Sequence, residues 1–240
     1  MAAAEFPGRL LVESEPHDGR WNMAFDEALL EAAVSRGEAT LRVYRWSEPT
    51  LSLGYFQKSP PPDLPEPLLA LPRVRRLTGG GAILHHHEWT YSCAVPKGHP
   101  LAARSEVLYD AAHEALIAAF ADLGVAASLR GEADRAADAN FLCFLRGDPR
   151  DVLVAGRKVV GSAQRRRRGA VLQHGSVLLR RSPLAPDVPG LEDLAPAAVT
   201  GPLWAVDGFV ARFAPRLFSG TPLTEPSGGD LGFAMRIAAD

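Results

Sequence analysis

The chain has little cysteine, no long hydrophobic run and almost no net charge. Its 240 residues include two cysteines, too few for a disulfide framework, which favours a reducing, cytoplasmic location. No apolar run approaches the roughly 18–20 residues of a membrane-spanning helix, and the first residues lack the charged and apolar regions of a secretion signal. The net charge of −2 gives no support for nucleic acid or a membrane as a partner. We therefore expect a cytoplasmic protein that binds neither.

What the chain does have is the composition of a globular domain, together with many glycines and prolines. Hydrophobic residues make up 47% of it and charged residues 22%, and a chain of this length can bury a large core. The 20 prolines concentrate around residues 59–72 and 183–202. We expect a single domain over residues 1–240, in which 183–202 is a proline-rich connecting stretch.

Hydrophobic periodicity predicts a mixture of strands and helices. Residues 40–55 are interpreted as a pair of strands joined by a turn, and residues 73–96 as three strands with a glycine turn after the first. Further strands are predicted at 9–14, 151–155, 158–163 and 169–179, and helices at 21–34, 105–123 and 206–217. Clusters of strands separated by a few helices indicate an α+β fold, with a central mixed, largely antiparallel sheet flanked by helices.

A glycine-rich turn, Thr78-Gly79-Gly80-Gly81, follows Arg75 and Arg76. Consecutive glycines permit positive φ and let backbone N–H groups approach a ligand closely. The turn lacks the Gly-Lys-Ser/Thr of a phosphate-binding loop and does not match the dinucleotide fingerprint. It is either a flexible hairpin turn or a loop that holds a substrate.

The run His85-His86-His87-Glu88 raises the question of a metal site. On a strand His85 and His87 share one face, so two ligands could converge. A structural zinc site needs four ligands and a catalytic one three, and neither Cys93 nor His99 stands at a recognisable spacing. We therefore predict no metal, and expect a histidine or two to line a polar pocket.

The two cysteines have different surroundings. Cys93 lies in an apolar strand and is predicted to pack in the core. Cys143, in Asn-Phe-Leu-Cys-Phe, is either an inert buried thiol or a nucleophile, and a nucleophile needs a cation close enough to hold the thiolate. Lys158, at the start of a glycine-flanked strand, would supply that cation if the cysteine loop folds back on the strand.

Four consecutive arginines, Arg165–Arg168, lie between two predicted strands. Such a run is usually the solvated tip of a hairpin. It could instead dock an acidic partner protein, whereas one short run in a nearly neutral chain is a weak signal for nucleic acid. The next strand carries Gln173-His174-Gly175-Ser176, which could orient a substrate.

Together these blocks resemble the lipoyl-attachment branch of the biotin/lipoate protein ligase superfamily. The resemblance extends from Trp-Asn-Met-Ala-Phe-Asp-Glu at residues 21–27 to Leu179. It is carried by Arg-Arg-Leu-Thr-Gly-Gly-Gly-Ala-Ile-Leu-His at 75–85, Gly-Arg-Lys-Val-Val-Gly-Ser-Ala-Gln at 156–164 and Gln-His-Gly-Ser at 173–176. Within that branch the chain is most similar to the octanoyltransferases with a nucleophilic cysteine in a loop, because Cys143-Phe144 and Lys158 match their Cys-Phe and lysine.

The resemblance implies the catalytic-domain fold of that superfamily and an acyltransferase activity. Octanoate would pass from octanoyl-acyl carrier protein to a lysine of a lipoyl-domain protein, such as the glycine cleavage H protein, through a cysteine thioester. No cofactor and no metal would be required. Cys143 would be the nucleophile, and Lys158 would stabilise its thiolate and hold the carbonyl oxygen. The implied substrate-binding residues are Arg75, Arg76, Thr78, Gly79, Gly80, Gly81, His85, Gly161, Ser162, Ala163 and His174.

The resemblance leaves alternatives open. In an ATP-dependent lipoate–protein ligase the arginine-glycine block would bind an acyl-adenylate, with ATP and Mg, and Cys143 would be incidental. Gly81 is more typical of those ligases, whereas the short chain after Leu179 disfavours their extra accessory domain. Transfer of an acyl group between two lipoyl domains would use the same thioester chemistry. A non-catalytic binder of acylated lipoyl domains would not need both Cys143 and Lys158.

Overall fold

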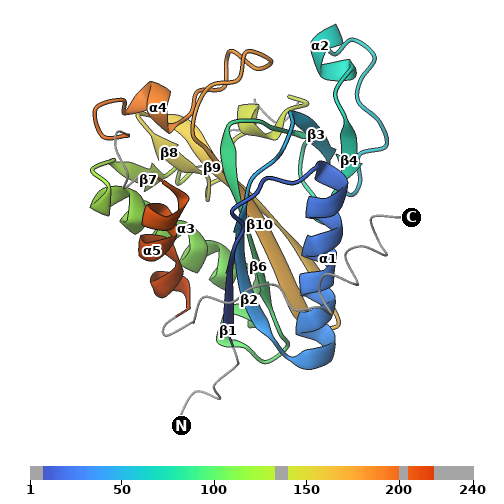
Figure 1. Cartoon of the computed structure of the whole chain (residues 1–240), viewed down its shortest axis with the longest axis vertical. Helices are drawn as coiled ribbons and strands as arrows, with labels where there is room; N and C mark the ends of the chain where they lie inside the picture. The colour runs from blue at the N-terminus through green and yellow to red at the C-terminus, as the bar shows by residue number, and fades with distance from the viewer. Residues whose placement is uncertain (1–7, 133–139, 200–204, 219–240) are drawn as a thin grey trace.

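The computed structural model describes residues 8–132, 140–199 and 205–218, and a seven-stranded mixed sheet forms its centre (Figure 1). The strands, in their order across the sheet, are β1 (Gly8–Val12), β2 (Ala39–Tyr44), β6 (Glu88–Val95), β10 (Ala170–Leu178), β9 (Arg157–Arg167), β8 (Val152–Val154) and β7 (Ala127–Leu129). Only β1 and β2 pair in parallel, and all other neighbours are antiparallel. The predicted mixed, largely antiparallel sheet is confirmed.

A second, three-stranded sheet corrects one prediction. It contains β4 (Arg73–Arg75), β3 (Thr50–Leu53) and β5 (Ile83–His85), in that order. Residues 40–55 do form two strands, but β2 pairs with β1 and β6 while β3 pairs with β4 and β5. The prediction that these two strands pair with each other is wrong, because alternation identifies a strand without identifying its partner.

Helices cover both faces of the large sheet (Figure 1). Helix α1 (Gly19–Arg36) packs on one face, and α3 (Ser105–Asp122) and α5 (Val206–Leu217) pack on the other. The predicted helices are thus confirmed. The short elements are α2 (Glu66–Leu69), α4 (Leu191–Leu194) and the 3₁₀ turns η1 (Pro100–Ala102) and η3 (Cys143–Leu145). Helix α4 lies in the predicted proline-rich stretch 183–202, whose last three residues are outside the described part of the chain.

Strand β9 is longer than predicted, which changes the place of the arginine run. It continues to Arg167, and the turn to β10 falls at Arg168 and Gly169, both with positive φ. The arginines therefore occupy the end of a strand and not only a hairpin tip. Arg167 pairs with Glu27 and Glu31 of α1, so it is not a free cation.

A buried arginine ties α1 to the sheet. The Arg42 side chain has no exposed surface, and its guanidinium lies 2.8 Å from Glu13 Oε1 and 2.9 Å from Asp26 Oδ1. It also donates to Asn22 Oδ1 at 2.8 Å. Burial alone would raise the pKa of Asp26, but a hydrogen bond from His174 and the charge of Arg42 hold it below its usual value.

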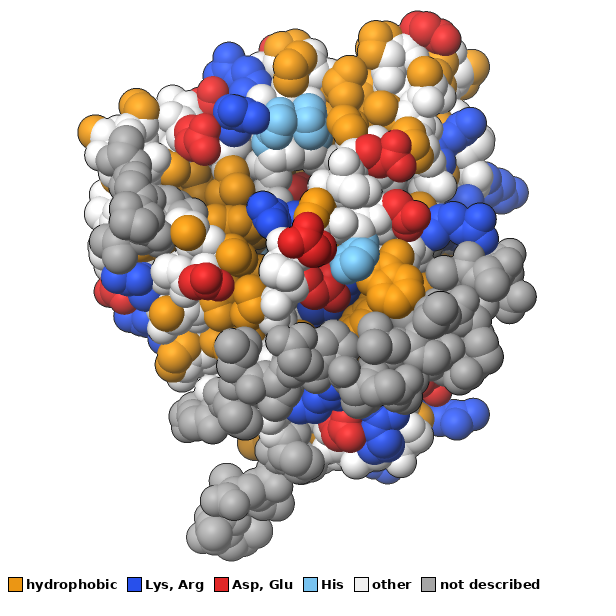
Figure 2. Space-filling view, viewed as in Figure 1, with side chains coloured by type: hydrophobic (Ala, Val, Ile, Leu, Met, Phe, Trp, Pro, Cys, Tyr) orange, Lys and Arg blue, Asp and Glu red, His pale blue; other side chains and the backbone are white. Residues whose placement is uncertain are grey.

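No helix in the described ranges is long and apolar enough to cross a bilayer. On the face shown in Figure 2, acidic and basic side chains are interspersed.

We predict that Arg42→Met lowers the free energy of unfolding by about 3–5 kcal/mol, because it leaves the buried carboxylate of Asp26 and the partly buried carboxylate of Glu13 without their cation. Urea denaturation measures the change. Arg36→Met is the control, since Arg36 pairs with Glu38 at the surface and such pairs contribute about 1 kcal/mol or less. A loss for Arg42→Met no larger than for the control would contradict the prediction.

Candidate active site

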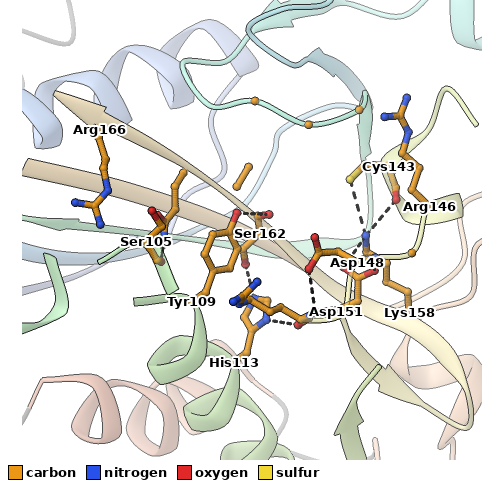
Figure 3. A pocket seen from close by; sticks show the side chains of 17 residues that line it. Ser105, Tyr109, His113, Cys143, Arg146, Asp148, Asp151, Lys158, Ser162 and Arg166 are labelled. Carbon is orange, nitrogen blue, oxygen red and sulfur yellow. Dashed lines mark hydrogen bonds and ion pairs between the residues drawn. The ribbon is translucent and has the colours of Figure 1, made fainter. Parts of the chain in front are cut away.

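A cavity of about 490 Å³ lies along the part of β9 that β8 leaves uncovered (Figure 3). Strand β8 pairs with β9 only as far as Val160, so the edge of residues 161–167 is open. The glycine loop, α3 and the loop 143–151 complete the walls. The lining residues are Gly79, Gly80, Gly81, Ser105, Tyr109, His113, Cys143, Arg146, Gly147, Asp148, Arg150, Asp151, Lys158, Ser162, Ala163, Gln164 and Arg166.

Cys143, Lys158 and Asp151 form a connected group in one wall of this cavity (Figure 3). Lys158 Nζ lies 3.9 Å from Cys143 Sγ and donates to the Cys143 carbonyl oxygen at 3.1 Å. It also contacts Asp151 Oδ1 at 2.8 Å. Burial raises the pKa of Asp151, and the charge of Lys158 opposes this shift. The Cys143 thiol thus lies beside the Lys158 ammonium group, and the Asp151 carboxyl group binds the same ammonium group.

A β-bulge aims the Lys158 side chain. Val152 pairs with Val160 while Leu153 pairs with Lys158, so one extra residue, Val159, stands in β9. Such a residue shifts the alternation of side chains between the two faces of a sheet. The Lys158 chain consequently passes over Gly161, where a Cβ would lie 2.7 Å from Lys158 Cε. Gly161 therefore acts by leaving space for the lysine.

The cysteine loop is attached to the glycine loop through the backbone. Cys143 N donates to the Ala82 carbonyl oxygen at 2.7 Å, and Ala82 N donates to the Phe141 carbonyl oxygen at 3.1 Å. A Cβ at Gly81 would lie 2.9 Å from the Arg146 guanidinium. A side chain at the third glycine would therefore displace the Arg146 guanidinium and press on the Phe141 carbonyl oxygen, 3.1 Å away.

Arg76 holds the glycine loop from behind. Its guanidinium, which is buried, donates to the carbonyl oxygens of Gly79 at 2.7 Å and Gly81 at 2.6 Å. It also donates to the Ser52 carbonyl oxygen, and the Ser52 hydroxyl lies 2.7 Å from His85 Nε2. Burial lowers the pKa of Arg76 to about 10, so it remains charged at neutral pH.

A second buried histidine holds the start of the same loop. His174 Nε2 lies 2.7 Å from Thr78 Oγ1, and its Nδ1 lies 3.3 Å from Asp26 Oδ2. Burial lowers the pKa of His174, although Asp26 opposes this shift. The glycine loop is thus connected to α1 through a chain of buried side chains.

A hydrogen-bonded chain crosses the other wall of the cavity. His113 Nδ1 donates to the Arg150 carbonyl oxygen, so its Nε2 must accept, and the Ser162 hydroxyl lies 2.7 Å from it. Ser162 Oγ also lies 2.7 Å from the hydroxyl of Tyr91, which accepts from the Gln173 amide at 2.7 Å. Ser162 therefore donates its hydroxyl hydrogen to His113 Nε2 and accepts the hydroxyl hydrogen of Tyr91.

The structure brings part of the predicted set together around the cavity. Its lining includes Cys143, Lys158, the glycines 79–81, Ser162 and Ala163. The other predicted residues are not part of the lining: Arg76, Thr78, His85, Gly161 and His174 are buried outside it, and Arg75 is exposed and donates to the carbonyl oxygens of Gln57 and Lys58. Their roles in substrate binding stay predictions. The described residues contain no group of three or more His, Cys, Asp or Glu arranged to hold a metal ion.

Sequence reasoning missed Asp151 and His113. A signal for Asp151 exists, because Ala155 and Gly156 both have positive φ and form the tight turn between β8 and β9. A hairpin at that turn returns Lys158 to the neighbourhood of Asp151. His113 carries no such local signal, since it stands on the buried stripe of α3 between apolar residues.

The model of the lipoyl protein ligase A/B catalytic domain matches residues 18–183. This chain belongs to the lipoyl protein ligase A/B family. This chain is 42% identical over 175 residues to octanoyltransferase LipM of Kyrpidia tusciae. The alignment covers 69% of this chain and 64% of that relative. Over 166 residues it is 40% identical to octanoyltransferase LipM of Carboxydothermus hydrogenoformans, covering 68% and 61% respectively. The chain thus spans less than two thirds of the length of these LipM relatives.

Solved structures of the family share the fold. The crystal structure of lipoate-protein ligase A bound with ATP superposes with a TM-score of 0.76 at 20% identity, over 98% of this chain and 95% of that one. The structure of a putative lipoate protein ligase from T. acidophilum superposes with a TM-score of 0.73 at 21% sequence identity. The superposition covers 96% of this chain and 94% of that one. The predicted α+β fold of the lipoate-ligase catalytic type is confirmed.

We predict that Lys158→Met slows alkylation of Cys143 by iodoacetamide at neutral pH by roughly tenfold, because the thiolate loses the adjacent ammonium group. Mass spectrometry of the Cys143 peptide measures the rate. Lys97→Met, a lysine that lies against Gly169 at the turn after β9, is expected to leave it unchanged. Cys93 is fully buried, and burial raises the pKa of its thiol, so it should react only on unfolding. Equal rates for Lys158→Met and the unchanged protein would refute the stabilising role.

The buried His113 should make the protein less stable in acid. Burial lowers the pKa of His113 to about 4, whereas an unperturbed histidine titrates near 6.5. The unfolded chain binds the additional proton between these values, so the free energy of unfolding falls as the pH drops through this range. We expect a loss of about 2 kcal/mol through this residue between pH 7 and pH 5.

Urea denaturation of His113→Gln at both pH values tests this loss. The substitution should reduce the difference between pH 7 and pH 5, while His17→Gln, at a half-buried position near the surface, should not. An unchanged difference in His113→Gln would mean that other groups cause the acid sensitivity.

Proposed function

We propose that this protein transfers an octanoyl group to a lysine of a lipoyl-domain protein through a thioester on Cys143. The observation that carries the proposal is the position of Cys143 Sγ, 3.9 Å from Lys158 Nζ in the wall of the cavity of about 490 Å³. Relatives at about 40% identity are octanoyltransferases, which supports the same acyl group here.

The proposed reaction has two steps, each an acyl transfer. In the first, the Cys143 thiolate attacks the thioester carbonyl of the donor, and the donor leaves as a thiolate that takes a proton from solvent. In the second, the uncharged lysine amine of the acceptor attacks the octanoyl-Cys143 thioester, the amine nitrogen loses a proton to solvent as the amide forms, and the thiolate of Cys143 is released. In both steps Lys158 Nζ would donate a hydrogen bond to the carbonyl oxygen as that oxygen gains negative charge.

The energetics of this sequence require no nucleotide. A thioester replaces a thioester in the first step, and a more stable amide replaces it in the second. We propose octanoyl-acyl carrier protein as the donor and the glycine cleavage H protein as an acceptor, with no cofactor. The open edge of β9 lies along the cavity, and beside Cys143 the lining offers Tyr109 and Ala163 as apolar side chains for an acyl chain, of which each buried methylene contributes about 0.8 kcal/mol.

The packing of Gly81 bears on the ligase alternative. From sequence, a third glycine favours an ATP-dependent ligase. In this chain a Cβ at Gly81 would lie 2.9 Å from the movable Arg146 guanidinium and 3.1 Å from the Phe141 carbonyl oxygen, so the cysteine loop leaves little space for a side chain there. The glycine thus has a packing explanation beside the ligase explanation, and the activity measurements below decide between the two functions.

We predict that incubation with octanoyl-acyl carrier protein adds one octanoyl group to Cys143, as a hydroxylamine-sensitive adduct in the intact mass. Cys143→Ala should show none, and the matched control Cys93→Ala should be acylated like the unchanged protein. Lys158→Met should slow adduct formation by at least 100-fold, because it loses both the thiolate partner and the hydrogen bond to the developing oxyanion.

Two results would contradict the transferase. One is an equal adduct on Cys143→Ala. The other is pyrophosphate release that depends on ATP and free lipoate and persists in Cys143→Ala, which would establish the ligase instead.

A further inference from the structure

Two aromatic side chains project from the surface beside the cavity. Tyr55 is 43% exposed and Phe56 82% exposed, and their rings meet edge to face with centroids 5.1 Å apart. Among large hydrophobic residues in the described ranges, only Leu129 is otherwise as open to solvent, at 37%. Neighbouring exposed aromatic rings are typical of a surface that binds a partner.

The turn that carries these rings is held in place. Gln57 N donates to the Gly54 carbonyl oxygen at 2.9 Å, and Gly54 N donates to Gln57 Oε1 at 2.9 Å. Tyr55 N donates to the Thr78 carbonyl oxygen at 2.9 Å, and Arg75 donates to the Gln57 carbonyl oxygen. A partner would therefore meet an ordered surface and would not need to fix the loop first.

This surface adjoins the cavity. Gly54 packs against Gly80, where a Cβ on Gly54 would collide with the Gly80 carbonyl oxygen, and Gly80 lines the cavity. The guanidinium carbon of Arg165 lies 4.5 Å from the centre of the Tyr55 ring. The following residue, Arg166, lines the cavity at the end away from Cys143 (Figure 3).

The segments that build this surface are basic. Residues 49–62, 73–87 and 152–186 contain no aspartate or glutamate, although the whole chain has a net charge of only −2. Arg167 is paired with two glutamates of α1, whereas Arg165 makes no ion pair with any described residue. The partner that fits is therefore acidic around an apolar patch.

We propose that Tyr55, Phe56 and Arg165 form the docking surface for the acyl acceptor, an acidic domain that presents its lysine at the cavity. The inference rests on the proposed octanoyl transfer. A lysine has only four methylenes with which to reach Cys143, so its domain must sit on the rim of the cavity. A donor that carries its thioester on a long arm can dock farther away.

The test uses preformed octanoyl-Cys143 enzyme and unmodified glycine cleavage H protein as the probe acceptor. Phe56→Ala is expected to raise the acceptor KM at least tenfold, as truncation of a central aromatic contact does. Arg165→Gln is expected to raise it about threefold to tenfold and to weaken its dependence on salt, because a rim charge acts mainly through long-range attraction. The matched controls Leu129→Ala and Arg167→Gln should change the KM less than twofold.

A small amine separates docking from chemistry. Aminolysis of octanoyl-Cys143 by Nα-acetyl-lysine amide should proceed at equal rates in Phe56→Ala, Arg165→Gln and the unchanged protein. Acylation of Cys143 by the donor should also be unchanged. An acceptor KM within twofold of normal in both variants would overturn the proposal, and so would an increase confined to the donor KM.

Direct titration of unacylated protein with the H protein keeps the two proposals distinguishable. If Cys143 is never acylated, the proposed function fails. The docking surface then stands if Phe56→Ala weakens H-protein binding at least tenfold relative to Leu129→Ala, and it fails if the two variants bind alike. Thermal midpoints of all variants should match, since none of the substituted side chains is in the core.

Discussion

The guanidinium of Arg76 is the contact on which the shape of the cavity depends. It is buried beneath the glycine loop and has no carboxylate partner among the described residues, so carbonyl and hydroxyl oxygens provide its stabilisation. Those oxygens belong to Ser52 of the small sheet and to both ends of the three-glycine turn. A loop without side chains has little packing of its own, and the buried cation replaces that packing with directional hydrogen bonds.

The cysteine loop depends on Arg76 indirectly, because it is attached to the glycine loop that Arg76 holds. It has no helix or long strand of its own, and it is attached through backbone hydrogen bonds to Ala82, just after the glycines. The position of the Cys143 thiol is therefore determined by the glycine loop, and that of Lys158 by the bulge in β9. Two chain segments far apart in sequence meet because each is held by a separate, rigid element. This arrangement is what a preorganised site requires.

Much of the fold could be predicted from sequence, because period-two and helical patterns directly reflect which side chains are buried. The pairing of strands could not, as residues 40–55 show, since alternation is the same whichever strand lies beside it. Thiolate chemistry makes a nearby cation a condition for a nucleophilic Cys143, and the family resemblance names Lys158, but only the structure shows the two atoms 3.9 Å apart. The turn at Ala155 and Gly156 indicates the hairpin that brings Asp151 near Lys158, but the bulge at Val159 that aims the lysine side chain has no sequence pattern, and Asp151 was therefore missed. The histidines at 85 and 174 were placed in the right region, but they hold the loop from behind and do not line the cavity.

The open edge of β9 has a consequence for the behaviour of the protein in concentrated solution. A strand edge without a neighbour displays unpaired N–H and C=O groups and can add a strand from another molecule. Here residues 161–167 have no strand neighbour on that side within the described chain, and the segment ends in consecutive arginines. Like charges brought side by side in an edge-to-edge pair repel each other, so Arg165 and Arg166 disfavour the addition of a second copy of the chain at this edge, whereas the charge of Arg167 is balanced by Glu27 and Glu31.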